Sequence, residues 1–315
     1  MKAVFLDAAT FSRQANLPAP DGVSEYQVFD HTANDANLII ERCTDADIII
    51  TNKVVLDRRI IEALPKLKLI QLTATGMNNI DQAACQDTGV QLFNVAGYSV
   101  NTVPEHTLMM MLSVMRAAKH YHQVATDGTW QADGRFCLLD EPLFDLAGQT
   151  LGIIGAGAIG RHVGELAKAF GMSVLYAERR GQAPRDDSYT AFETVLADSH
   201  IISLHCPLTE DTERLINDQT IAQMHNKPLI INVARGGVVD GGSIVRALDS
   251  GQIFGYASDV FDDEPFAADD PLLSIMNHPR VLYTPHNAWG SLRAQHKLWQ
   301  ILSAQVSQFI GEHQS

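Results

Sequence analysis

The chain has 315 residues, 46% of them hydrophobic, and a formal net charge of -14 at pH 7. That length predicts two domains rather than one hydrophobic core, and ordinary counts of 22 Gly and 12 Pro exclude fibrous and disordered classes. The negative charge argues against nucleic-acid and anionic-membrane partners, which need clustered positive charge, but it is compatible with a small anionic ligand held by a few buried arginines.

Short apolar runs alternate with helix-like segments along the first hundred residues. The predicted strands are 2–6, 26–29, 47–51, 68–72 and 90–94, and helices are predicted at 34–43 and 57–64. A segment rich in Leu, Met and Ala then predicts a long helix after Thr102, with Pro104 near its start, where a helix tolerates proline. Alternating strands and helices are typical of βαβ units around a parallel sheet.

A second alternating series follows the long helix. Its predicted strands are 150–155, 173–178, 200–206, 228–234, 254–260 and 281–285, and its predicted helices are 158–170, 190–197, 218–225 and 240–250. These elements complete a doubly wound domain over 101–286 and leave 29 residues, too few for another domain. A last helix, 290–311, is therefore expected to return to the first part, so that 1–100 and 287–315 form one discontinuous domain. Ligands favour the cleft between two such domains.

A dinucleotide fingerprint opens the second series. The segment "TLGIIGAGAIG" matches G-x-G-x-x-G through Gly155, Gly157 and Gly160, with a strand directly before it and an Ala-rich helix after it. Gly155 permits the tight turn, Gly157 lets the backbone approach a pyrophosphate, and Gly160 allows close packing of helix and strand. The N–H groups of the helix N-terminus are then offered to the phosphates. A glycine-rich turn in another α/β protein is the alternative.

The end of the next predicted strand bears on the choice of cofactor. Glu178 lies 18 positions beyond Gly160, about where a carboxylate binds the adenosine ribose hydroxyls. Because a carboxylate repels a 2′-phosphate, NAD is predicted in preference to NADP. Arg179 and Arg180 follow directly and could neutralise such a phosphate, so NADP stays open as an alternative.

Three chemically active side chains follow three neighbouring strands of the second series. Arg235 follows "LIINVA", Glu264 lies in "FDDEP", and His286 follows "VLYTP". Parallel strands present their carboxyl ends to the ligand crevice. A histidine exchanges protons near neutral pH, a carboxylate orients it, and an arginine binds a substrate carboxylate through two hydrogen bonds. Taken singly, each has a plainer alternative, namely a surface ion pair, a loop residue before Pro265 and a turn histidine.

The segments "NVARGGVVD", "DVFDDEP" and "TPHNAWGS" resemble three signature segments of the D-isomer-specific 2-hydroxyacid dehydrogenases, and the resemblance covers nearly the whole chain. It implies an α/β fold of two Rossmann-like doubly wound parallel-sheet domains, the substrate domain being discontinuous. It also implies that Arg235 binds the substrate carboxylate, that Glu264 is the partner of the histidine, and that His286 is the catalytic acid and base.

The resemblance carries over further binding residues. It implies that backbone amides of Ala74, Thr75 and Gly76 hold the substrate carboxylate, although Met77 and Asn78 depart from the common pattern of the family. A tryptophan at the position of Trp289 resembles the pattern of family members that act as glycerate dehydrogenases or hydroxypyruvate reductases. The alternative is that Trp289 only packs at the start of the last helix. The expected cofactor contacts are Thr102, Gly155, Gly157, Ala158, Ile159, Gly160, Glu178, Arg179, Cys206, Pro207, Val233, Ala234, Asp259 and His286.

These observations predict a cytoplasmic NAD(H)-dependent dehydrogenase that reduces hydroxypyruvate or glyoxylate to D-glycerate or glycolate. Another 2-oxo acid such as pyruvate, or an NAD(H)-sensing regulatory protein on the same fold, is the alternative. The resemblance implies a homodimer built partly by the long helix. Four dispersed cysteines without a CxxC pair, and His120 and His122 two positions apart on a helix, predict neither a disulfide framework nor a metal site.

Overall fold

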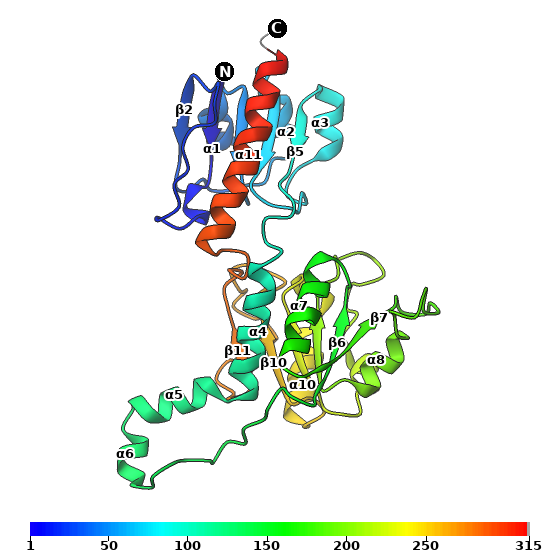
Figure 1. Cartoon of the computed structure of the whole chain (residues 1–315). Coiled ribbons are helices and arrows are strands. Elements are labelled where there is room, and N and C mark those ends of the chain that lie inside the picture. Colours follow the sequence, from blue (N-terminus) through cyan, green and yellow to red (C-terminus); the bar gives the residue numbers. More distant parts are fainter. Residues whose placement is uncertain (314–315) are drawn as a thin grey trace. The chain divides into compact units, whose positions relative to one another are not determined.

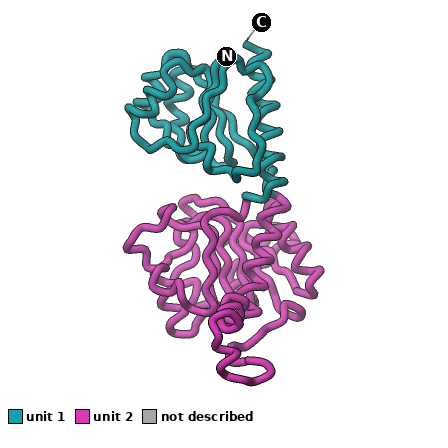
Figure 2. The backbone as a smooth tube through the Cα atoms, turned by 90° about the vertical axis from the view of Figure 1, so that its left-hand side faces the viewer, with its two compact units in different colours: residues 1–99, 290–315 teal, residues 100–289 magenta. Residues whose placement is uncertain are grey.

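The computed structural model describes residues 1–313 and divides into two compact units, coloured separately in Figure 2. Unit 1 holds residues 1–99 and the chain from Gly290 onward, and unit 2 holds Val100–Trp289. The second boundary therefore lies three residues beyond the expected one at 286. The reason is local, since the amides of Asn287 and Ala288 both donate to the carboxylate of Asp259, which fastens them to unit 2.

Unit 1 is a parallel five-stranded sheet in the order β2-β1-β3-β4-β5. Its strands are β1 (Lys2–Phe5), β2 (Glu25–Val28), β3 (Ile48–Thr51), β4 (Leu69–Leu72) and β5 (Gln91–Phe93). Its helices are α1 (Ala36–Cys43), α2 (Arg58–Glu62), α3 (Gln82–Thr88) and α11 (Leu292–His313), with a 3-10 turn, η1, at Ala8–Thr10. The chain order reverses between β1 and β3, a position where open α/β sheets bind ligands.

The two faces of this sheet are covered by different parts of the chain, because successive strand residues point to opposite sides. Val4 and Ile49 pack with residues of α1, α2 and α3 in one apolar cluster. Phe5 stacks instead on Trp299 of α11, with ring centroids 5.5 Å apart. The last helix thus covers the second face of the first sheet, as Figure 1 shows. Its return to the N-terminal strands makes unit 1 discontinuous.

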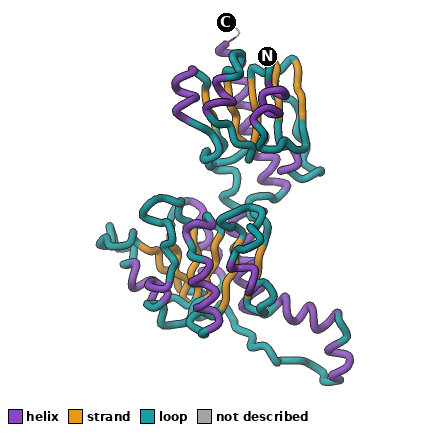
Figure 3. Tube along the Cα trace, turned by 180° about the vertical axis from the view of Figure 1, so that it is seen from behind, coloured by secondary structure: helices purple, strands orange, loops and turns teal. Residues whose placement is uncertain are grey.

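Unit 2 is a parallel six-stranded sheet in the order β11-β10-β9-β8-β6-β7. Its strands are β6 (Thr150–Ile154), β7 (Ser173–Ala177), β8 (Ile201–Leu204), β9 (Leu229–Asn232), β10 (Gly255–Ser258) and β11 (Val281–Tyr283). Its helices are α4 (Thr102–Met115), α5 (Ala118–Thr126), α6 (Thr129–Asp133), α7 (Ala158–Ala169), α8 (Phe192–Asp198), α9 (Asp218–Ile221) and α10 (Gly241–Asp249), with 3-10 turns η2 (Gly236–Val238) and η3 (Pro271–Ile275). Figure 3 shows the strands of each unit lying between helices.

Two apolar clusters cover the two faces of the second sheet. Ile153 and Val163 belong to the cluster that includes α4 and α7, whereas Ile154 and Ile244 belong to the cluster that includes α8, α9 and α10. Because both faces are covered, the strands are nearly continuous runs of buried aliphatic residues. The predicted α/β fold of two doubly wound parallel sheets is confirmed.

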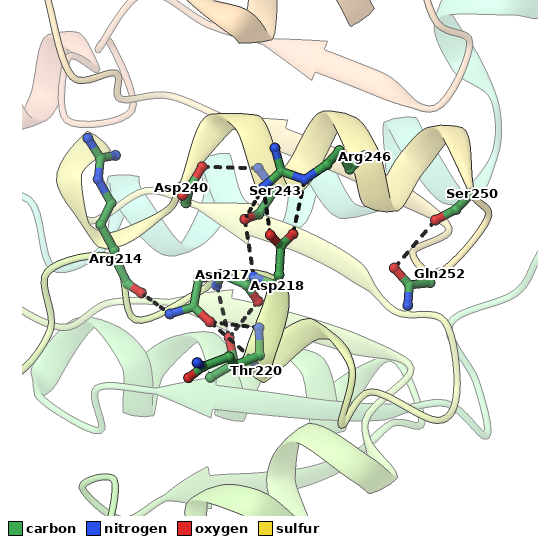
Figure 4. Close-up of polar contacts among 10 residues, drawn as sticks. Arg214, Asn217, Asp218, Thr220, Asp240, Ser243, Arg246, Ser250 and Gln252 are labelled. Atoms are coloured by element: carbon green, nitrogen blue, oxygen red, sulfur yellow. Dashed lines mark hydrogen bonds and ion pairs between the residues drawn. The ribbon is translucent and has the colours of Figure 1, made fainter.

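Polar contacts fix the short helix α9 against α10 (Figure 4). Asn217 and Thr220 form a reciprocal capping box at the start of α9. Arg246 of α10 pairs with Asp218 at 2.7 Å, and the Ser243 hydroxyl accepts from the amide of Asp218. A helix of four residues cannot hold itself together, so these contacts and its buried face stabilise it.

The long helix predicted after Thr102 is wrong as a single element. It is interrupted at Arg116 and Ala117, and Ala117 takes a left-handed conformation with φ of 47°. Ala117 is fully buried, and the amide of Phe144 donates to the carbonyl of Met115 just before it. No glycine or proline marks this break, so packing rather than local propensity causes it. Beyond it, α5 and α6 extend away from the sheet of unit 2 (Figure 1).

The helix α6 was absent from the sequence prediction, whereas α3 lies between the predicted strands 68–72 and 90–94, where the alternation implies a helix without giving its bounds. The signals for the ends of α3 are local. Asp81 caps its first turn by accepting from the amide of Ala84, and Gly89 ends it with φ of 76°. Among the described residues, no helix is both long and apolar enough to span a bilayer.

Candidate functional site

The ends of β9, β10 and β11 lie side by side at one edge of the second sheet, because these strands are parallel neighbours. Arg235 follows β9, Asp259 follows β10, and His286 follows β11. Glu264 lies in the loop after β10. This edge is where ligands bind in open parallel sheets.

His286 and Glu264 form the central pair of this edge. The imidazole Nδ1 lies 2.5 Å from Oε2 of Glu264, and both side chains are partly exposed. The other carboxylate oxygen of Glu264 accepts from the amide of Phe261 at 3.0 Å, so the carboxylate is fixed by its own loop. A carboxylate on Nδ1 orients the ring and leaves Nε2 as the nitrogen that can exchange a proton with a substrate.

The backbone of His286 is held in a left-handed conformation, with φ of 49°. Its amide donates to the carbonyls of Asp259 at 2.8 Å and of Thr284 at 3.0 Å. Such a conformation is unfavourable for a residue other than glycine and persists only where neighbouring contacts enforce it. The structure therefore enforces the direction in which this histidine leaves the sheet.

Asp259 fastens the segment that carries His286. Its carboxylate is 2% exposed and accepts from the Thr284 hydroxyl at 2.5 Å and from the amides of Asn287 and Ala288 at 2.9 Å each. An unpaired buried donor costs about 1–3 kcal/mol, so this carboxylate is important for the position of the loop. The sequence prediction made Asp259 a cofactor contact, and the structure adds this positioning role.

His106 extends the same network from helix α4, and the sequence analysis did not single it out. Its Nε2 lies 3.0 Å from the Thr284 hydroxyl and 3.7 Å from Asp259. Burial lowers the pKa of His106, and the nearby Asp259 only partly opposes this effect. Thr102, at the start of the same helix, donates to the carbonyl of Ala288 at 3.2 Å. The only sequence signal for His106 was its place in the long helix predicted after Thr102.

Arg235 is exposed at the start of the 3-10 turn η2, and its Nη1 donates to the carbonyl of Ala234 at 2.6 Å. Asn232 fastens this bend by donating to the carbonyl of Arg235 and accepting from the amide of Ala234. A Cβ on Gly236 would overlap the backbone of Phe261. Glycine at this position therefore lets the loop bearing Arg235 pack directly against the loop that leads to Glu264.

The glycine fingerprint has the geometry that a dinucleotide pyrophosphate needs. Gly155 has φ of 103°, and a Cβ there would overlap the backbone of His205 and Cys206. A Cβ on Gly160 would overlap the carbonyl of Gly155, whereas Gly157 faces open space at the start of α7. No side chain caps this helix, so its first amides are left for an anion. The residues present thus fit a dinucleotide.

The other expected cofactor contacts border the same strand ends. Ala158 is exposed and Ile159 half-buried in the first turn of α7, while Val233 is half-buried and Ala234 buried after β9. Cys206 is buried and Pro207 exposed after β8. Burial raises the pKa of the Cys206 thiol to about 11, so the thiol is neutral. Trp289 is half-buried and is the last residue of unit 2.

Glu178, directly after β7, is engaged by an arginine that the sequence analysis did not single out. Its Oε2 accepts from Nε of Arg185 at 2.7 Å, and its Oε1 accepts from Nη2 of the same guanidinium at 2.5 Å. The Arg185 guanidinium holds the pKa of Glu178 at about 2. The expected ribose-binding carboxylate is therefore ionised but already paired. The partner comes from the polar loop 181–189, where no local pattern predicts it.

The loop after β4 of unit 1 contains the three residues expected to bind a carboxylate. The Thr75 hydroxyl donates to the carbonyl of Val95 at 2.9 Å, and Asn94 donates to the carbonyl of Thr75 at 2.7 Å. Within residues 1–313, the amides of Ala74, Thr75 and Gly76 donate no hydrogen bond. Three successive unpaired amides are suited to binding an anion.

A family model, curated relatives and a solved structure all show similarity to 2-hydroxyacid dehydrogenases. Residues 108–288 match the family model described as "D-isomer specific 2-hydroxyacid dehydrogenase, NAD binding domain". The chain is 40% identical to a putative 2-hydroxyacid dehydrogenase of Haemophilus influenzae, covering 98% of each chain. It is 37% identical to a glycerate dehydrogenase of Methylorubrum extorquens, covering 98% of this chain and 96% of the relative. Among solved structures, D-lactate dehydrogenase from Aquifex aeolicus complexed with NAD and lactic acid superposes with a TM-score of 0.80 at 26% identity, covering 99% and 96% of the two chains.

Proposed function

We propose, from the premise that this chain belongs to the D-isomer specific 2-hydroxyacid dehydrogenase family, that it reduces hydroxypyruvate or glyoxylate to D-glycerate or glycolate. As a member of that family it is an NAD(H)-dependent oxidoreductase. The pair formed by His286 and Glu264 carries the proposal, because reduction of a 2-oxo acid requires a positioned proton donor. The choice of substrate is supported by relatives named glycerate dehydrogenase and hydroxypyruvate reductase, at 37% and 32% identity.

The residues at the strand ends are proposed to have separate roles in the reaction. When bound, NADH supplies the hydride that reduces C2 of the 2-oxo acid. His286 holds a proton on Nε2 and donates it to the oxygen on C2, while Glu264 keeps the ring oriented. Arg235 binds the substrate carboxylate through its planar fork and polarises the adjoining carbonyl. In the direction of oxidation, His286 takes the proton back.

Other residues are proposed to bind rather than to transfer protons. The amides of Ala74, Thr75 and Gly76 hold the substrate carboxylate, and Trp289 contacts the substrate. The fingerprint from Gly155 to Gly160 holds the cofactor pyrophosphate. The remaining proposed cofactor contacts are Thr102, Glu178, Arg179, Cys206, Pro207, Val233, Ala234, Asp259 and His286. The unpaired amides of the 74–76 loop and the uncapped start of α7 support these assignments.

A panel of 2-oxo acids tests the proposed substrate. Hydroxypyruvate, glyoxylate, pyruvate and 3-phosphohydroxypyruvate are each mixed with the full chain and NADH, and the fall in NADH absorbance is followed. We expect the highest kcat/KM with hydroxypyruvate or glyoxylate. A higher kcat/KM with pyruvate or with the phosphorylated acid would contradict the substrate. Binding of NADH without turnover of any acid would instead favour a cofactor-sensing protein.

We propose that two copies of the chain form a dimer through the segment that extends from unit 2. Phe136 is 95% exposed and Leu139 is 69% exposed in the stretch that follows α6, and Trp130 of α6 is also exposed. Large apolar side chains grouped on one projecting segment are typical of a protein interface. A symmetric partner would bury the same segment of both copies.

The assembly is measurable by size-exclusion chromatography with light scattering. The wild-type chain is expected at twice the mass of one chain, and the double variant Phe136→Ser with Leu139→Ser is expected as a monomer, since it loses apolar area at the interface. Phe170→Ser, at an exposed phenylalanine of unit 2 outside this segment, is the matched control and should remain a dimer. A wild-type monomer would refute the assembly, and a dimeric double variant would refute this interface.

A cytoplasmic location is also proposed. In the part of the chain that the structure describes, Cys43, Cys85 and Cys206 are buried and unpaired, and Cys137 is exposed and unpaired. Reduced thiols are typical of proteins in a reducing compartment.

A further inference from the structure

The carboxylate of Glu178 has its hydrogen-bonding capacity already filled. Besides the Nε and Nη2 groups of Arg185, it accepts from the amide of Arg179 at 2.8 Å and from the amide of Arg185 at 3.1 Å. An ionised carboxylate offers about four acceptor positions. Glu178 is also 4% exposed, so it is a buried anchor for the 179–185 loop rather than an open acceptor for two ribose hydroxyls.

The charge around Glu178 does not exclude a phosphate group. A bare carboxylate excludes a 2′-phosphate by repulsion, but the bidentate contact with Arg185 neutralises Glu178. Arg179 and Arg180 follow on the exposed surface, and within residues 1–313 neither side chain forms an ion pair or hydrogen bond. Asp187 is exposed nearby in the same loop and opposes this positive charge in part.

The Arg185 side chain is held in place while part of it stays available. Its guanidinium lies over the ring of Tyr189 at 4.3 Å, and the Tyr189 hydroxyl accepts from Arg161 at 3.2 Å. Asp186, the adjacent acid, is occupied by the amide and hydroxyl of Ser188. Nη1 of Arg185 donates to no residue within 1–313, and the side chain is half exposed. A guanidinium of this kind presents N–H groups in the planar array that suits a phosphate.

We propose that the end of β7 is a binding site for the 2′-phosphate of NADPH, in which Arg185, anchored by Glu178, determines specificity together with Arg179 and Arg180. The inference rests on the proposed function for its cofactor chemistry and extends it from NADH to NADPH. Glu178 would serve here as the support of Arg185, and the enzyme would bind both cofactors.

Direct binding tests this site without any 2-oxo acid. Titration calorimetry of the full chain is carried out with NADPH, NADH, adenosine 2′,5′-bisphosphate and 5′-AMP. The wild type is expected to bind NADPH measurably and to bind the bisphosphate more tightly than 5′-AMP. Arg185→Gln should weaken binding of NADPH and of the bisphosphate about tenfold to a hundredfold, the range for a lost hydrogen bond to a charged group. Its binding of NADH should be unchanged or tighter, because Glu178 is released.

Two further variants separate specificity from folding. Arg246→Gln removes an exposed arginine that also pairs with a carboxylate in unit 2, and it should change neither affinity. The double variant Arg179→Gln with Arg180→Gln removes two exposed charges and leaves the contact between Arg185 and Glu178 intact, so it should weaken binding of NADPH more than binding of NADH. If Arg185→Gln binds neither cofactor, this double variant decides, and an equal effect on the two cofactors would overturn the proposal.

Other outcomes also overturn the site. Equal weakening of NADH and NADPH in Arg185→Gln would make Arg185 a purely structural part of the loop. A wild-type chain that binds 5′-AMP as tightly as the bisphosphate would show that no 2′-phosphate is recognised. Because these measurements use no substrate, failure to reduce hydroxypyruvate would count against the proposed function and leave the cofactor result standing.

Discussion

Replacing His286 with Ala is expected to lower kcat by about 10²–10⁴-fold, the contribution of a positioned general acid. The pairing with Glu264 holds Nδ1, and the left-handed backbone of the histidine fixes where the ring points. Alanine removes the proton donor without adding bulk at the cofactor site. The affinity for NADH, measured by fluorescence titration, should fall far less than kcat, because His286 is only one of many proposed cofactor contacts. The fall in NADH absorbance with hydroxypyruvate should slow strongly.

His225→Ala is a suitable control for this experiment. His225 is exposed on unit 2 and lies outside the proposed site, so its loss should alter neither NADH affinity nor kcat. If His286→Ala retained kcat within about tenfold of the wild type, below the range expected for general acid catalysis, the assignment of the proton donor would be wrong. A parallel loss of NADH binding would indicate instead that the histidine mainly supports the cofactor site.

Replacing Arg235 with Gln is expected to lower kcat/KM for the 2-oxo acid by about 30-fold to several thousandfold. Removing one partner of a hydrogen-bonded charge pair costs about 2–5 kcal/mol, which corresponds to this range. Arg235→Lys keeps the charge but lacks the planar fork, so it should recover only part of the loss. NADH absorbance measures kcat/KM, and binding of oxamate, a substrate-like carboxylate, measures recognition separately.

The predictions for Arg235 separate recognition of the carboxylate from support of the loop. Oxamate affinity should fall in Arg235→Gln while NADH affinity stays unchanged. The control is Arg246→Gln, which leaves the strand ends untouched and should bind oxamate normally. Unchanged oxamate affinity in Arg235→Gln would contradict the assigned role, whatever the effect on turnover.

Local patterns in the sequence were sufficient for the architecture. Each predicted strand overlaps one of the strands β1 to β11, because a buried parallel strand is a short apolar run that is visible in the residues themselves. The fingerprint glycines also follow from local chain geometry, as the left-handed φ of Gly155 illustrates. The predicted family and the NAD-binding domain are both confirmed by comparison. The roles of the site residues stay predictions.

Tertiary structure decided the features that depend on pairing between separate segments. The break at Ala117 opposes the helical preference of alanine and follows from burial. Asp259 is fastened to residues 25 to 29 positions away, and the partner of Glu178 comes from an irregular loop. The spacing of hydrophobic residues and the turn residues specify how one segment folds. They carry no information about which distant side chain donates a hydrogen bond to a buried acceptor. Packing alone therefore determined how His286 is held and how Glu178 is neutralised.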